Sequence, residues 1–218
     1  MAVTNTRTVR EICTRALRLA GVTPVGESAE AEDMDEAVET LNDMLKGWQG
    51  RAWGVWTVAS QSLTLTTAAS YTLDPVRPLA VLNANLKRDG IETPMQRMTR
   101  DEYDEIPDKD STGLPTTYYY DRQREAAKFY VWPVLSTAAG ETVEITYTRE
   151  QEDIASPNDV VDVPGEVWEP VVYMLASRLM DVYGVSDKPL VAQRAEALRI
   201  EAEAFDREGS VYFMPEMW

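Results

Sequence analysis

Carboxylates are almost the only side chains in this sequence that could perform acid–base chemistry. The chain contains 37 Asp and Glu residues, no histidine and a single cysteine, Cys13. Two carboxylates, one acting as an acid and one as a base, can hydrolyse a glycosidic bond. Neither spacing nor neighbouring residues single out such a pair. We therefore expect most of the acids to form solvated surface or to lie at helix ends.

The lack of histidine excludes Ser-His-Asp triads and Cys-His pairs, and with one cysteine it also excludes the usual zinc sites. Cys13 falls on the apolar face of a predicted helix, which indicates a small buried side chain rather than a reactive thiol. The sequence has neither a P-loop nor a glycine-rich dinucleotide fingerprint. We therefore expect no catalytic residue, no cofactor and no metal, and hence not an enzyme.

One segment is similar to the start of a calcium-binding EF-hand loop. It contains Asp108, Asp110, Thr112 and Gly113 at the appropriate spacing. The position that needs a bidentate glutamate is occupied by Tyr119, so the pattern fails at its most important ligand. We expect no calcium site here.

Aromatic residues are concentrated in two segments, 118–120 and 129–133. They could line a surface on which sugars or bases stack. Alternating aromatic residues more often pack one face of a sheet and place amphipathic tyrosines on the other. Packing is the favoured interpretation, and a carbohydrate-binding module remains an alternative.

The C-terminus is unusually apolar for a chain end. Its six large apolar residues are Val211, Tyr212, Phe213, Met214, Met217 and Trp218. Leaving them in water forgoes about 25 cal/mol for each Å² that could be buried. We expect the segment to dock, either on the chain's own helices or in pockets of a partner, which would make these six the partner-binding residues.

Hydrophobic periodicity predicts four amphipathic helices, near residues 8–20, 29–49, 163–184 and 189–207. Thr8 and Glu11 are spaced as a capping box at the start of the first helix. Between the second and third helices the period changes to two, which is typical of strands, and Asp89-Gly90 predicts a hairpin turn. Thr99 can cap a short helical turn in this region.

These elements predict an α+β protein: an antiparallel four-helix bundle formed by the N- and C-terminal regions, an inserted β-rich domain and an extended C-terminal tail. The expected domains are residues 1–54 (N-terminal helical hairpin), 55–160 (β-rich insertion), 161–208 (C-terminal helical hairpin) and 209–218 (docking tail).

The formal net charge of −16 is spread along the chain, and no basic stripe interrupts it. Such a surface repels nucleic acid rather than binding it. No apolar run approaches the roughly 20 residues of a membrane helix, and the N-terminus lacks the apolar core of a signal peptide. We expect a soluble chain made in the cytoplasm, with no membrane contact.

Three stretches, in order, resemble a known family. The first contains Ala20-Gly21-Val22, Ala31-Glu32-Asp33, Ala37, Leu41-Asn42-Asp43-Met44-Leu45 and Trp48. The second contains Gly113-Leu114-Pro115, Tyr118-Tyr119-Tyr120, Phe129-Tyr130-Val131-Trp132-Pro133 and Val143-Glu144-Ile145-Thr146-Tyr147. The third contains Val163-Pro164, Tyr173, Leu175-Ala176, Leu179 and Tyr183-Gly184. Together they resemble the head-to-tail adaptor proteins of short-tailed phages, the group called tail tubular protein A or packaged-DNA-stabilisation protein.

This resemblance implies a structural virion protein at the head–tail junction, made in the host cytoplasm. Such adaptors form a twelve-subunit ring between the portal and the tail nozzle and continue the DNA channel, through which the genome passes without specific binding. Their C-terminal segments commonly embrace the portal, and the β insertion commonly meets the nozzle. A carboxylate-based hydrolase of cell-wall glycan and a carbohydrate-binding module are the alternative functions.

Overall fold

The computed structural model describes residues 6–49, 57–73, 77–124 and 127–205. The protein is of the α+β class, as the sequence predicts, with helices from both ends of the chain packed together. The chain divides into two compact units: a helical unit of residues 1–56 and 151–218, and a sheet unit of residues 57–150.

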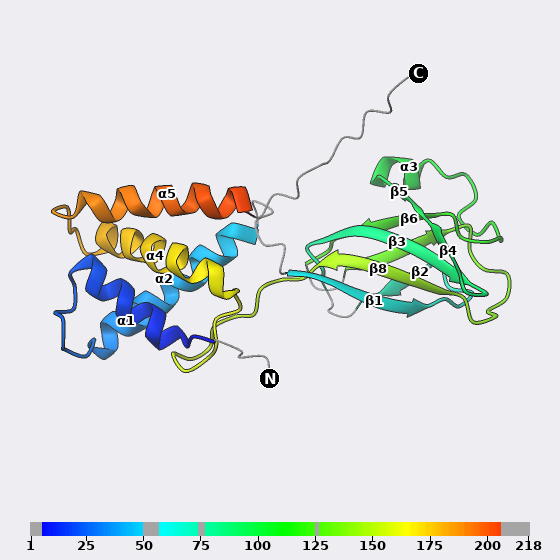
Figure 1. Cartoon of the computed structure of the whole chain (residues 1–218). Coiled ribbons are helices and arrows are strands. Elements are labelled where there is room, and N and C mark those ends of the chain that lie inside the picture. Colours follow the sequence, from blue (N-terminus) through cyan, green and yellow to red (C-terminus); the bar gives the residue numbers. More distant parts are fainter. Residues whose placement is uncertain (1–5, 50–56, 74–76, 125–126, 206–218) are drawn as a thin grey trace, which may run out of the picture. The chain divides into compact units, whose positions relative to one another are not determined.

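The helical unit is organised around one helix. Its helices are α1 (Val9–Ala20), α2 (Ala31–Gln49), α4 (Trp168–Val182) and α5 (Pro189–Phe205), with the 3₁₀ turn η2 (Gly165–Val167) before α4. Helix α4 contacts the other three, and it lies between α1 and α5 in Figure 1. Because it has neighbours on several sides, α4 is apolar around most of its circumference. Its buried residues are Trp168, Pro170, Val171, Val172, Leu175, Ala176, Leu179 and Met180.

The first helix begins and ends where its sequence signals predict. Thr8 Oγ1 accepts a hydrogen bond from the Glu11 amide at 3.3 Å, and Glu11 Oε2 accepts one from the Thr8 amide at 2.9 Å. This reciprocal pair is the predicted capping box. Gly21 ends the helix with φ +87°, a conformation that glycine adopts without steric cost.

The sheet unit contains two four-stranded sheets (Figure 1). Their strands are β1 (Val58–Thr64), β2 (Ser70–Thr72), β3 (Ala80–Arg88), β4 (Ile91–Pro94), β5 (Gln96–Met98), β6 (Thr117–Asp121), β7 (Lys128–Trp132) and β8 (Thr142–Thr148). The orders are β1-β8-β3-β4 and β2-β7-β6-β5, and every pairing is antiparallel except that of β5 with β6.

Alternate residues of the two sheets share one core. The first sheet contributes Val81, Ala84, Leu86, Val143 and Ile145, and the second contributes Tyr118, Tyr120, Phe129 and Val131. The unit has two sheets because the segment 91–98 is divided between them. Pro94 ends β4, which pairs with β3, and beyond the buried Met95 the chain continues as β5 in the other sheet.

Candidate partner-binding surfaces

A loop of 14 residues, 151–164, joins the end of the strand region to α4 and is fastened to α2. The side-chain amide of Asn42 donates to the Ile154 carbonyl at 3.0 Å and accepts from the Ile154 amide at 3.1 Å. Lys46 Nζ, one turn further along α2, donates to the Gln151 carbonyl at 3.1 Å and lies 2.5 Å from the Asp153 carboxylate. Asn42 therefore acts as a substitute for a strand partner.

The same loop also accepts hydrogen bonds from the first amides of α1. The first amides of a helix have no partner within the helix. Here the Val9 amide donates to the Asp159 carbonyl at 2.9 Å, and the Arg10 amide donates to the Pro157 carbonyl at 2.7 Å. The loop thus connects the two helices of the N-terminal region with the C-terminal region.

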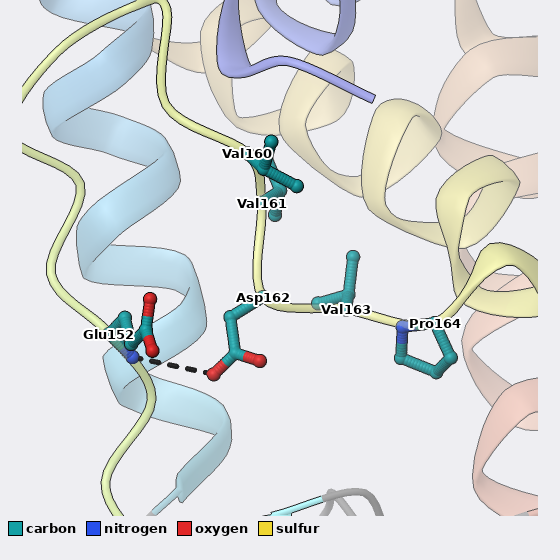
Figure 2. Close-up of a pocket in the computed structure, with 6 residues that line it drawn as sticks. All are labelled: Glu152, Val160, Val161, Asp162, Val163 and Pro164. Atoms are coloured by element: carbon teal, nitrogen blue, oxygen red, sulfur yellow. Dashed lines mark hydrogen bonds between the residues drawn. The ribbon is translucent and has the colours of Figure 1, made fainter. Parts of the chain in front are cut away.

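A surface hollow of about 360 Å³ lies along this loop (Figure 2). It is lined by Glu152, Val160, Val161, Asp162, Val163 and Pro164. Asp162 Oδ2 accepts a hydrogen bond from the Glu152 amide at 3.5 Å, and Figure 2 shows its carboxylate turned toward that main chain. Valine and proline side chains and two carboxylates share the walls, which are therefore both apolar and polar.

The aromatic segments singled out in the sequence lie on both sides of the second sheet. Tyr118 and Phe129 stack inside the core with ring centroids 5.1 Å apart. Tyr119 and Tyr130 lie on the other face, where Tyr103 of α3 (Arg100–Asp104) covers them at centroid distances of 5.2 and 5.0 Å. Tyr119 is only 8% exposed as a result. The arrangement favours packing over an open surface for sugar or base stacking.

Two further interactions hold this aromatic region. The guanidinium group of Arg100 lies over the Tyr119 ring at 5.9 Å and contacts the Asp121 carboxylate at 2.7 Å, and both neighbours raise its pKa, the carboxylate more. Tyr120 donates to the Pro78 carbonyl at 2.5 Å, and burial raises its pKa to about 12.

The segment similar to an EF-hand loop is a hydrogen-bonded turn. Asp108 accepts hydrogen bonds from the Asp110 amide at 3.1 Å and from Ser111 Oγ at 2.9 Å. Its carbonyl also accepts from the indole of Trp132 at 3.1 Å. These interactions give the Asp108 carboxylate a structural role in the turn.

Cys13 lies where the sequence predicts, fully buried in the helical core. Burial raises the pKa of its thiol to about 12. A thiol with that pKa is protonated at neutral pH and is a poor nucleophile.

Three polar residues make tertiary contacts that the sequence does not predict. Asn42 and Lys46 hold the loop 151–164. An asparagine in the middle of a helix is a sequence signal for such a tertiary contact, because its side chain otherwise competes with the helical backbone. Tyr183, the residue after α4, does not pack in the helical core. Instead it is 37% exposed and donates to Asp33 Oδ1 at 2.7 Å, and burial together with this carboxylate raises its pKa to about 12.

The predicted docking residues, from Val211 to Trp218, lie outside the described residues. Within the ranges that the structure describes, no helix is both long and apolar enough to cross a membrane.

The features described above are packing and hydrogen-bonding interactions within the chain. Residues 7–210 match the family model described as SU10 adaptor protein. The chain belongs to this family, which is one of phage adaptor proteins. This confirms the resemblance to phage adaptors that its sequence shows. No curated protein sequence matches the chain significantly.

Proposed function

We propose that the protein is a virion component that forms a ring between the portal and the tail nozzle and continues the DNA channel, the role of the tail tubular protein A group. The observation that carries this proposal is the match to a phage adaptor family over residues 7–210. A ring of identical chains repeats one head-to-tail interface around a closed circle, so each small contact is multiplied. Twelve copies is the stoichiometry we propose.

The division into two units supports a division of labour. We propose that the four helices close one bundle in the ring and face the portal, that the sheet unit is a separate inserted domain that meets the nozzle, and that residues 209–218 form the docking tail. The net charge of −16 supports a negative channel wall, along which DNA slides without specific binding.

The tail is proposed as the main portal anchor. Val211, Tyr212, Phe213, Met214, Met217 and Trp218 offer aromatic and aliphatic groups of the kind that dominate binding energy at interfaces. Docking in portal pockets would bury surface that water solvates poorly.

Light scattering tests the proposal. The purified chain is measured alone and then mixed with the portal ring of its phage. We expect a discrete complex with many adaptor copies on one portal, and no metal or cofactor should be required. A chain that forms no complex with the portal at any salt concentration would overturn the proposed function.

A tail variant tests the anchor. Removal of residues 210–218 should leave a folded chain whose affinity for the portal is lower by at least about 100-fold, because several hot-spot residues are lost together. Glu216→Gln is the matched control, since it changes the tail without removing an apolar side chain. Unchanged binding by the truncated chain would refute the anchor.

A further inference from the structure

The outer face of α1 is positively charged in an otherwise acidic protein. Arg10, Arg15 and Arg18 are all exposed on it and span about 12 Å along the helix. Arg18 donates to the Glu27 carbonyl and Arg10 to the Asn158 amide oxygen. Within the described ranges, none of the three arginines forms an ion pair with a carboxylate. The carboxylate on the same face, Glu11, is occupied by the capping box. These three arginines are called the arginine face.

The outer face of α2 carries the opposite charge. Glu32, Asp35, Glu39 and Asp43 are exposed, lie within one side of the helix and span about 16 Å. In the part of the chain that the structure describes, none of them pairs with a cation. The nearest lysine on that side, Lys46, is occupied by Asp153. These four acids are called the acidic face.

The helix dipole does not account for the acidic face. A carboxylate is stabilised by the dipole only within the first turn. In the 19-residue helix α2, which begins at Ala31, Glu32 satisfies that condition, whereas Glu39 and Asp43 lie in its middle. The acids therefore continue along the helix for a length that matches the arginine face.

Repulsion between copies limits which surfaces can bring two copies together. Two chains of net charge −16 repel each other, so stable association of copies requires surfaces where opposite charges meet. The arginine face and the acidic face belong to one unit, have similar lengths and remain unpaired with each other. They are thus available to complement the faces of another copy.

We propose that the arginine face of one copy binds the acidic face of the next copy, head to tail. Because the two surfaces differ, the contact is heterologous and can close into a ring. This inference rests on the proposed ring and names its subunit interface.

Charge reversal tests the interface sharply. Variant one carries R10E, R15E and R18E, so both of its faces are acidic. Variant two carries E32K, D35K and E39K, so both of its faces are basic. We expect each variant alone to associate at least tenfold more weakly than the natural chain, and an equimolar mixture to recover association with the two variants alternating. Sedimentation velocity at low and high salt measures this, with circular dichroism to verify folding.

A matched control separates the interface from bulk charge. R97E, R124E and K128E place the charge change of variant one on exposed positions of the sheet unit, and this variant should associate like the natural chain. Normal association of either reversed variant alone, or a mixture that fails to associate at low salt, would overturn the inference.

The portal experiment distinguishes the two proposals. If the mixture of variants associates but nothing binds the portal, the subunit interface stands and the proposed function fails. If the natural chain and both variants load the portal with equal copy numbers, the function stands and this interface is wrong.

Discussion

The two units differ in how parts of the chain that are distant in sequence are joined. The sheet unit is one continuous stretch whose first and last strands pair with each other, Val58 opposite Thr148. The helical unit is assembled from two stretches that are about 100 residues apart in sequence. Close termini allow a domain to be inserted into another without disturbing it. The interrupted helical unit, by contrast, depends on packing and on the loop 151–164 to hold its halves together.

The largest expected effect comes from cutting the chain at this division. Residues 57–150 expressed alone should fold cooperatively, because every strand pairing lies inside the fragment. Residues 1–56 alone should show little stable helix, since the apolar faces of α1 and α2 lose α4. Addition of a 151–218 fragment should restore helicity, as measured by circular dichroism. A 1–56 fragment that is stably helical on its own would show that the N-terminal half of the helical unit does not need the C-terminal half.

The next largest effect is expected from a cavity in the hydrophobic core of one unit, which should destabilise that unit alone. Leu175→Ala in α4 should lower the free energy of unfolding of the helical unit by about 2–5 kcal/mol, because a buried side chain leaves a cavity. Phe129→Ala is the matched change in the sheet unit and should cost about 3–5 kcal/mol there. Hydrogen exchange resolved by segment reports each unit separately. Equal loss of protection in both units after either change would mean that they unfold together.

A smaller effect is expected at the loop that joins the helical halves. Asn42→Ala removes both hydrogen bonds to Ile154 and should destabilise the helical unit by about 1–3 kcal/mol. Glu152→Ala, at an exposed position of the same loop, serves as the control and should change stability by less than about 0.5 kcal/mol. Denaturant unfolding measures both variants, and equal midpoints would show that the loop is not held by Asn42.

The smallest effect is the pH dependence of the sheet unit. Hydrogen bonds from Thr99 lower the pKa of Glu102, and the Ala139 and Glu141 amides lower that of Glu141. A lowered folded pKa gives stability that is present above the ordinary glutamate pKa of about 4.3 and is lost as pH falls below it. Both residues lie in the sheet unit. Thermal unfolding from pH 6 to pH 3 should therefore show a smaller decrease for the double variant E102Q/E141Q than for the natural sheet unit.

Local signals were enough to predict the individual helices, strands and turns. They were not enough to predict how these elements are arranged in the tertiary structure. The capping boxes at Thr8 and Thr99, the Gly21 stop and the Asp89-Gly90 turn act over a few residues and are visible in sequence. The division of residues 91–98 between two sheets depends on the partners of each half. The bonds of Asn42 to Ile154 join residues 112 positions apart, which no local pattern encodes.

Candidate contact residues show the same limit. The arginine face and the acidic face can be read as charges in the sequence, but their exposure and lack of partners become visible only when the helices are packed. The aromatic segments were identifiable by composition, whereas their cover by Tyr103 required the position of α3.

The central position of α4 also affects how the chain is made. About 120 residues separate the end of α2 from the start of α4, and translation at roughly 5–20 residues per second takes about 6–24 s to cross them. During that interval α1 and α2 have left the ribosome without the helix that covers their apolar faces. We expect this nascent hairpin to be the stage at which host chaperones bind the protein, and slower translation of residues 50–167 to increase aggregation.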